Sequence, residues 1–560
     1  MYKRFALSIA MLAVGAAMLA AAGIASPGSA QKTSSPAGSV AKKGGIFKVT
    51  LFANIENIDP QRSYYAPEWQ YEWLTARPLL DFAHAPGARG YRLLNEGAQS
   101  YTVSRDGRTY TFHIRHGMKF SNGKPITAAN YKFTFMRILT PAVGSPLASF
   151  LTDPVSVNIV GALAYNTSGK GNVSGLQTKG KYTFIIKLVK PNALLATLVA
   201  LPPTGAEPNT LPMTPISSAP NANTLPSGGK YYVAQYVPDR SIKIRRNKYY
   251  TPAGAVPMPG NVDGFDYTIG VQQDQALLLI EKGQSDWAAD GLSPAAWGSL
   301  FAKYGTKGRA RVFATTISDY VTMNTSKGVF SNLNARKAVE YGINRKSLVK
   351  VRGPKAGSPE CSLLTPAIPG YKQCTVYPVN KQDTAKARTL ASGHTGHINY
   401  WYTATTTGTL IQRLASAQLN AIGFRDIDYK PFQSGLFSAL GKKGNDYDFA
   451  IIGWIADFPD PYDYINKLLG GSTIQAVQNN NTSYFNNPTA NKLMDKAAQL
   501  RGLQRFTTYG NLDSTIQKNW APVAGIDNRN DRDFFSARVA TSSIVGSPVY
   551  IVDLGKLALK

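Results

Sequence analysis

The stretch LNEGAQSYTVSRDGRTYTFHIRHGMKFSNGKPITAANYKFTFMR, from Leu94 to Arg137, contains the strongest local structure signals in the chain. Asp106 and Gly107 separate two alternating runs that are rich in β-forming residues, which is a strong signal for a β-hairpin. A Ser-Asn-Gly turn follows. Thr127 then precedes Ala-Ala-Asn and further apolar residues, which predicts an N-capped helix.

Outside this stretch, strand-like and helix-like runs alternate along the chain. The expected strands lie at 46–51, 181–190, 231–237, 241–245, 311–324, 398–403, 447–455, 522–526 and 548–553. The expected helices lie at 271–282, 338–348, 409–421, 489–500 and 512–519. Interleaved strands and helices predict the α/β class with mixed sheets.

Length and composition exclude several classes of protein. A chain of 560 residues with 43% hydrophobic residues has enough sequence for several buried cores. Its 50 glycines and 34 prolines argue against a coiled coil or helix bundle. The net charge of +28 attracts anionic surfaces, but the basic residues are spread along the chain. A nucleic-acid interface needs a clustered stripe or a known module, so we expect no nucleic-acid partner and retain a basic binding module only as an alternative.

The N-terminus has the pattern of a secretory signal. Two basic residues precede an uncharged run at 5–25, and small residues follow at 28–30. We predict a signal peptide at 1–30, cleaved at its end, and a flexible linker at 31–43. A retained membrane anchor is the alternative, because the uncharged run is long enough to span a bilayer. Ile24 stands where a lipoprotein signal would carry cysteine.

The two cysteines of the chain are Cys361 and Cys374. Export places them in an oxidising compartment, where a pair tends to form a disulfide. The residues between them include proline and glycine and are typical of a loop. We therefore predict an intrachain disulfide; two separate buried thiols are the alternative.

Catalytic and metal sites have little support in the sequence. His113 and His116 lie in a predicted strand, where an offset of three places them on opposite faces. His394 and His397 flank a turn, and neither pair has the further ligands that a zinc site needs. We expect no catalytic residues, no metal and no cofactor.

Three carboxylates follow the apolar run at 447–455, and they leave one enzymatic alternative open. Two of three such acids at a suitable separation would serve a glycosidase, and an acyl-transfer enzyme is a related alternative. Prolines place all three on a loop, where binding residues are also common. The three acids are Asp457, Asp460 and Asp463.

The stretch 94–137 resembles the signature of the family 5 extracellular solute-binding proteins, the peptide- and nickel-binding components of ATP-driven importers. Within it, the residues that match the family pattern are Asp106, Gly107, Tyr110, Thr111, Phe112, Arg115, Gly117, Phe120, Gly123, Pro125, Thr127 and Ala128. Further matches follow in the same order along the mature chain, including Gly-Gly at 44–45, Asp-Pro at 59–60 and GWIADFPDPYDY at 453–464. The resemblance is closest to the oligopeptide-binding branch.

This resemblance implies a two-lobe clamshell of the periplasmic-binding-protein type, similar to its class II, with an inserted subdomain. Lobe one is expected to be discontinuous, at 44–60, 181–315 and 517–560. The inserted subdomain is expected at 61–180 and lobe two at 316–516.

The resemblance also implies what the protein does. A small ligand, for which we expect a peptide, is captured between the lobes and delivered to the membrane permease of an ABC importer. The protein is expected to be an exported monomer, in the periplasm or at the extracytoplasmic cell surface, and not an enzyme.

A ligand site is implied at the same place as the three acids. By the resemblance, Asp457 pairs with the α-ammonium group of a peptide, with Trp454 beside it; a loop acid or helix cap is the alternative. Ile451 and Ile452 stand where some peptide binders carry an arginine. The aromatic residues expected to line the cleft, or else to pack in the core, are Tyr64, Tyr65, Trp401 and Tyr402.

Overall fold

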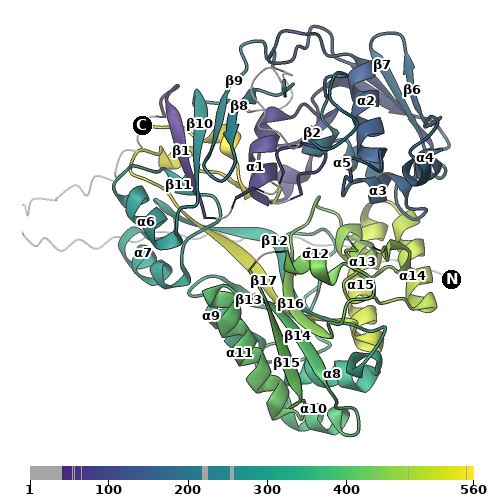
Figure 1. Ribbon diagram of the computed structural model, residues 1–560, viewed down its shortest axis with the longest axis vertical. Coiled ribbons are helices and arrows are strands. Elements are labelled where there is room, and N and C mark those ends of the chain that lie inside the picture. The colour runs from purple at the N-terminus through teal and green to yellow at the C-terminus, as the bar shows by residue number, and fades with distance from the viewer. Residues whose placement is uncertain are drawn as a thin grey trace, which may run out of the picture. The chain divides into compact units, whose positions relative to one another are not determined.

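The computed structural model of the chain is shown in Figure 1. It describes residues 41–560 except 53, 56, 65, 217–224, 253–257, 434, 477–478 and 550. The predicted signal peptide and most of the predicted linker, at 1–40, lie outside the described residues. Within the described ranges, no helix combines the length and the apolar character needed to cross a membrane.

A five-stranded mixed sheet contains the first strand of the chain. Its strands are, in spatial order, β11 (Trp287–Ala288), β1 (Ile46–Leu51), β10 (Gly264–Ile269), β9 (Ser241–Arg246) and β8 (Tyr231–Val237). β1 is parallel to both β10 and β11, whereas β8, β9 and β10 are antiparallel. The helices of this region are α1 (Ala66–Thr75), α6 (Gln273–Glu281) and α7 (Trp297–Tyr304).

A four-stranded antiparallel sheet contains the hairpin predicted from the sequence. Its strands are, in spatial order, β4 (Ala98–Val103), β5 (Thr109–Ile114), β7 (Thr183–Lys187) and β6 (Leu176–Lys179). Gly107 forms the turn between β4 and β5 with a φ of +70°, which glycine adopts without strain. The sheet includes β7 and therefore extends beyond residue 180, where the sequence analysis ended the inserted subdomain.

Helices accompany the four-stranded sheet. They are α2 (Ala128–Leu139), α3 (Ala148–Thr152), α4 (Ala162–Ser168) and α5 (Leu194–Leu198). The N-cap predicted at Thr127 is confirmed, because its backbone N–H donates to Asn130 Oδ1 at 2.9 Å. Phe135 of α2 packs against Phe184 of β7, with 5.7 Å between the ring centres. The helix therefore covers one face of the sheet.

A six-stranded mixed sheet contains the longest strands. They are, in spatial order, β13 (Gly357–Pro359), β17 (Val523–Phe534), β12 (Ala310–Met323), β16 (Phe449–Trp454), β14 (Ile398–Thr403) and β15 (Ile427–Phe432). β12 and β17 are antiparallel, with a bulge between Ala314 and Ser318. Beyond the bulge, their far ends reach the five-stranded sheet (Figure 1). There, Trp287 Nε1 donates to Asp533 Oδ1 at 2.6 Å.

Helices cover both faces of this sheet. One face packs on α8 (Leu333–Gly342), α9 (Arg345–Val351), α10 (Thr384–Ala391) and α11 (Thr406–Ala421). The remaining α-helices of the described residues are α12 (Leu436–Leu440), α13 (Tyr462–Leu469), α14 (Pro488–Gln499) and α15 (Gly502–Trp520). β16 sends Ile451 to the first face, and it sends Ile452 and Trp454 to the opposite face. Burial on both faces explains why this strand is a continuous apolar run.

Two short antiparallel pairs complete the strands of the described residues, β2 (Leu80–Phe82) with β3 (Leu93–Asn95) and β18 (Gly546–Ser547) with β19 (Ile551–Val552).

Several expected boundaries were wrong. The helix expected at 338–348 is two helices, α8 and α9, separated at Ile343 and Asn344. The helix expected at 512–519 starts ten residues earlier, at Gly502.

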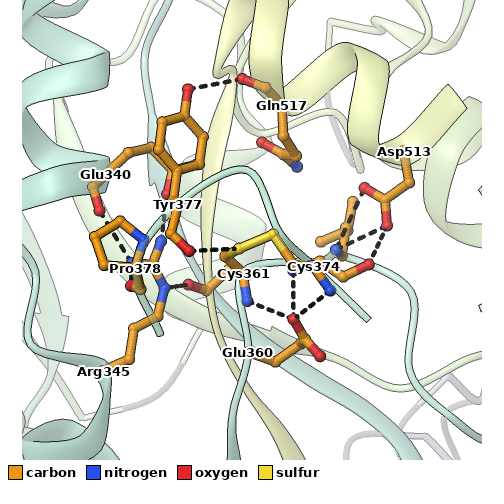
Figure 2. Close-up of a disulfide and its surroundings, with 12 residues drawn as sticks. Glu340, Arg345, Glu360, Cys361, Cys374, Tyr377, Pro378, Asp513 and Gln517 are labelled. Carbon is orange, nitrogen blue, oxygen red and sulfur yellow. Dashed lines mark hydrogen bonds and ion pairs between the residues drawn. A yellow bond between two sulfur atoms is a disulfide. The ribbon is translucent and has the colours of Figure 1, made fainter. Parts of the chain in front are cut away.

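The predicted disulfide between Cys361 and Cys374 is confirmed (Figure 2). Glu360 Oε1 accepts the backbone N–H groups of Cys361 at 2.8 Å and Cys374 at 3.2 Å, so one carboxylate holds both ends of the bridge. The loop also packs on α15, because Asp513 accepts the backbone N–H of Leu364 at 3.0 Å. The bridge therefore closes the loop, and Asp513 fixes the loop to α15.

Candidate functional site

The loop that follows β16 is held in place by Asp463, in the first turn of α13. Asp463 Oδ2 accepts the indole N–H of Trp454 at 3.0 Å and the backbone N–H of Asp457 at 2.8 Å. Asp463 is completely buried, and its second oxygen, Oδ1, has no hydrogen-bond partner. One carboxylate thus positions both Trp454 and Asp457, two of the six residues that the sequence analysis placed in the ligand site.

Asp457 reaches a residue that lies almost 400 positions earlier in the chain. The Tyr64 hydroxyl donates a short hydrogen bond to Asp457 Oδ2. Tyr64 is fixed in turn, since its backbone N–H donates to Glu68 Oε2 of α1 at 3.0 Å and its ring meets Trp69 edge-on, with 5.8 Å between ring centres. The structure therefore links Tyr64, Trp454 and Asp457 in one hydrogen-bond network through Asp463.

The Asp457 side chain is poorly solvated. Burial raises the pKa of Asp457 to about 6, although the Tyr64 hydrogen bond and the charge of Lys467 oppose that rise. Burial, and then the charge of Asp457, raise the pKa of Asp463 well above its ordinary value. Because two ionised carboxylates in a buried place repel one another, protonation of one of them is favoured. A cationic partner would instead stabilise the ionised form of both.

Lys467 lies one helical turn after Asp463 and contacts the helices of the four-stranded sheet. Its Nζ donates to Ser149 Oγ of α3 at 2.7 Å and lies 3.9 Å from the centre of the Phe150 ring. Phe150 also meets Phe458 edge-on, with 5.5 Å between ring centres. These contacts close the space between α3 and the loop that carries Asp457.

The other expected site residues are placed differently. Trp401 lies on the same face of the six-stranded sheet as Trp454, where it packs against Phe432, with 5.1 Å between ring centres. Tyr402, the next residue of β14, points to the opposite face and packs with the helices there. Tyr402 therefore does not join the Asp457 group, in contrast to the sequence analysis. Tyr65 lies outside the described residues.

The three acids considered for a hydrolase have separate partners. Asp460 forms an ion pair with Arg505 of α15 at 2.7 Å. Asp463 is buried and holds the loop, and Asp457 bonds to Tyr64. Two of the three acids thus have structural partners that account for them without an acid–base role.

Potential metal ligands gather at one place in the described ranges. Glu360 lies close to Cys361 and Cys374, and these two sulfur atoms are bonded to each other. His116 stacks on Tyr182, with 3.9 Å between ring centres, and His397 Nδ1 lies 3.1 Å from Asp426 Oδ1. These contacts account for both histidines without a metal ion.

Sequence reasoning missed three residues of this group. Ser149, Glu68 and Lys467 were not singled out, and Asp463 was considered only as a catalytic acid. The spacing of Asp463 and Lys467, four residues apart after Pro461, was the available signal for one helical face. No pattern in the sequence predicts that Ser149 lies opposite that face, because this contact depends on the packing of elements more than 300 residues apart.

Residues 94–476 match the family described as "Bacterial extracellular solute-binding proteins, family 5 Middle". The chain belongs to this family. Among its relatives, the periplasmic oligopeptide-binding protein OppA of Haemophilus influenzae is 23% identical over 86% of this chain and 87% of its own length. The probable deoxycholate-binding periplasmic protein YgiS of Escherichia coli is 22% identical over 77% of this chain and 78% of its own length.

Solved structures share the fold. The clavulanic acid biosynthesis oligopeptide binding protein 2 aligns with 92% of this chain and 96% of its own length, with a TM-score of 0.82 and 22% sequence identity. The predicted α/β fold with two lobes and mixed sheets is thereby confirmed. The hydrolase alternative is not supported, because the family is one of solute-binding proteins.

Proposed function

We propose that this family member captures a peptide between its lobes, with Asp457 as the partner of the peptide α-ammonium group, and delivers it to the permease of an ABC importer. The observation that carries the proposal is the environment of Asp457. This residue follows the central apolar strand β16, its backbone N–H is held by Asp463, and its carboxylate accepts a hydrogen bond from Tyr64, just before α1.

The Tyr64 hydroxyl marks the place that a ligand ammonium group would take. It is a neutral donor, and it bonds to a carboxylate whose pKa burial has raised to about 6. An ammonium group at that place would stabilise the ionised form of Asp457 and donate charge-assisted hydrogen bonds, which are stronger than neutral ones. Peptide entry would thus replace the tyrosine contact with a stronger one.

The names of the relatives support a peptide but do not all agree. OppA of H. influenzae and the clavulanic acid biosynthesis protein are named for oligopeptides, whereas YgiS is named for deoxycholate, an anion without an ammonium group. A buried acid at the centre of the site favours a cationic ligand group over an anionic one. We therefore place this chain with the peptide binders.

The remaining features of the proposal follow from this assignment. The protein acts as an exported monomer, in the periplasm or at the extracytoplasmic surface, after removal of residues 1–30. The long strands β12 and β17 connect lobe one, which holds the five-stranded sheet, to lobe two, which holds the six-stranded sheet. The four-stranded sheet is the inserted subdomain, which therefore runs past residue 180 to include β7. Trp401 and Tyr65 remain proposed lining residues of the cleft.

The proposal is tested with peptide mixtures rather than with one ligand. Random peptides of two to five residues are incubated with the mature protein, and retained peptides are identified by mass spectrometry after gel filtration. We expect peptides with a free N-terminus to be retained and N-acetylated peptides to be lost. Asp457→Asn removes the charge and keeps the shape, and it should weaken binding of a retained peptide by about 2–5 kcal/mol in calorimetry.

The matched control is Asp446→Asn, because Asp446 is an exposed acid in the same region, with 69% of its side chain accessible. It should leave the affinity unchanged. Equal retention of acetylated and free peptides, or an unchanged affinity in Asp457→Asn, would remove Asp457 from the site. Retention of deoxycholate in place of every peptide would overturn the peptide assignment.

A further inference from the structure

The long strand β12 is interrupted at one point between the two sheets that it joins. Its pairing with β17 stops at Ala314 and resumes at Ser318, so that the three residues at 315–317 stand opposite a single residue of β17. Ala310, before this bulge, packs in the core around α6 and α7, and Val321, after it, packs in a core of the six-stranded sheet. A bulge bends a strand, and a few such residues can absorb the backbone rotation of a hinge. We therefore take the bulge as the hinge in β12.

Hydroxyl groups hold the backbone of the bulge. Thr315 Oγ1 donates to the Arg529 carbonyl at 2.7 Å and accepts the backbone N–H of Ile317 at 3.0 Å. The Thr316 carbonyl accepts a hydrogen bond from the Tyr464 hydroxyl, which comes from α13, 148 residues further along the chain. Side chains thus replace the ladder bonds that the bulge interrupts, and one of these side chains belongs to another element.

The same turn of α13 holds the Asp457 loop. Tyr464 is completely buried and directly follows Asp463 in the helix. Asp463 accepts the Trp454 indole N–H and the backbone N–H of Asp457. Consecutive residues of a helix move together, because backbone hydrogen bonds hold the turn. Two adjacent residues therefore connect the hinge to the loop that carries Asp457.

A second hydroxyl reaches the bulge from a different element. Thr365 is completely buried in the loop that the disulfide closes, and its Oγ1 donates to the Thr315 carbonyl at 3.5 Å. This loop is fixed to α15 by Asp513. Thr365 can therefore brace the bulge without acting on the Asp457 loop, which makes it a useful comparison for Tyr464.

We propose that Tyr464 is a positioning residue that couples the hinge bulge of β12 to the ligand site. Its hydroxyl holds the Thr316 carbonyl in this arrangement of the lobes, and Asp463 beside it holds the Asp457 loop in the binding position. This inference rests on the proposed function and deepens it, since it names what regulates the Asp457 site. Opening of the lobes turns the bulge backbone, breaks this hydrogen bond and loosens the loop, so closure of the lobes and formation of the site are one event.

Tyr464→Phe tests the coupling, because it removes the hydroxyl and keeps the buried ring. Hydrogen exchange of the backbone amides is followed by mass spectrometry in the mature protein without ligand. Exchange should become about fivefold faster at 315–318, as expected for the loss of one neutral hydrogen bond. It should also become faster in the loop at 455–460. This second effect distinguishes coupling from a structural role, since a structural role would loosen α13 alone.

Two further variants serve as controls. The Tyr400 hydroxyl is also buried, in β14, and has no hydrogen-bond partner among the described residues, so Tyr400→Phe should leave exchange unchanged in both regions. Thr365→Val removes the other hydroxyl that reaches the bulge, and it should leave exchange at 455–460 unchanged. Urea unfolding of each variant shows that it is folded before exchange is measured.

Binding is measured with the free peptides of two to five residues that the mature protein retains. In the wild type, these peptides should slow exchange at 315–318 and at 455–460 together. Tyr464→Phe should release them about fivefold faster in stopped-flow dilution, because the closed form has lost one hydrogen bond, and the association rate should barely change.

The outcomes separate this inference from the proposed function. Unchanged exchange at 455–460 in Tyr464→Phe, or an unchanged release of peptides, overturns the coupling and leaves the peptide function standing. Faster exchange of this loop in Thr365→Val overturns the coupling as well, because the loop would then respond to the bulge without Tyr464. If the wild-type protein retains no peptide, the proposed function fails, whereas exchange in the protein without ligand still decides whether Tyr464 couples the hinge to the Asp457 loop.

Discussion

At the scale of single residues, Asp457 should reduce the stability of the ligand-free protein above pH 6. Its folded pKa is about 6, and that of an unfolded aspartate is 3.8. Between these values the folded protein holds a proton that the unfolded chain has released, so the free energy of unfolding falls as the pH rises. Asp457→Asn removes this dependence, and it should raise the free energy of unfolding by about 1–3 kcal/mol at pH 7.5.

Urea unfolding at pH 4 and pH 7.5 measures the effect. The variant should match the wild type at pH 4, where Asp457 is protonated in the folded protein, and exceed it at pH 7.5. Asp446→Asn serves again as the exposed control. A variant that is less stable than the wild type at both values would show that the Tyr64 hydrogen bond to ionised Asp457 outweighs the cost of burial.

Part of the hydrogen-bonded group around Asp457 could be predicted because that part is local in the sequence. Trp454 ends the apolar strand β16 and Asp457 follows it within a few residues, so the end of the strand and the acid of the loop could be predicted together. Tyr402 was misplaced because it is adjacent to Trp401 in β14, and neighbouring residues of a strand face opposite sides. Lys467 was missed because its contacts are with α3, more than 300 residues earlier in the chain, and no local pattern encodes them.

At the scale of elements, the disulfide loop should contribute strongly to stability. The bridge closes a loop of 13 residues in sequence separation, and the chain-entropy model gives about 3 kcal/mol for a loop of this size. Cys361→Ala together with Cys374→Ala should lower the free energy of unfolding by about 2–4 kcal/mol in urea. Thiol labelling of the unreduced, denatured wild type should find no free thiol.

Reduction supplies the control for this prediction. Wild-type protein unfolded and refolded with reductant should have the same urea midpoint as the double alanine variant, since both lack the bridge. The loop keeps its other contacts in both cases, because Asp513 and Glu360 still accept its backbone N–H groups. An unchanged midpoint in the variant would mean that these carboxylate contacts alone hold the loop.

Elements were predicted where the signal was contained in one short run. β8 and β14 were placed with their observed bounds, and the hairpin turn at Gly107 was found from two residues. β17 and α15 were predicted too short, because polar residues interrupt the apolar pattern from which a strand or a helix is predicted. Residues 527–533 of β17 are largely polar and charged, and they remain in the strand because β12 pairs with them on one side. Tertiary pairing, and not local propensity, sets the end of that strand.

At the scale of the whole molecule, buried acids should make the protein most stable at mildly acidic pH. Burial raises the pKa of Glu207 to about 8 and the pKa of Asp513 to about 6. His84 acts in the same direction, because Asp553 and Asp81 outweigh the effect of burial and raise its pKa to about 10. For all three groups the folded protein binds protons more tightly than the unfolded chain, so stability falls as the pH rises.

Repulsion among the excess basic residues opposes this trend only at lower pH. The chain has 61 lysines and arginines against 33 acids, and its exposed carboxylates become protonated below about pH 4.5. Between pH 5 and pH 8 the exposed carboxylates stay ionised, so the buried groups Glu207, Asp513 and His84 decide the slope. We expect the free energy of unfolding, measured in urea at constant salt, to fall by at least about 2 kcal/mol over this range. Glu207→Gln should flatten the slope, since glutamine does not titrate, whereas a stability that rises from pH 5 to pH 8 would mean that these acids are ionised in the folded protein.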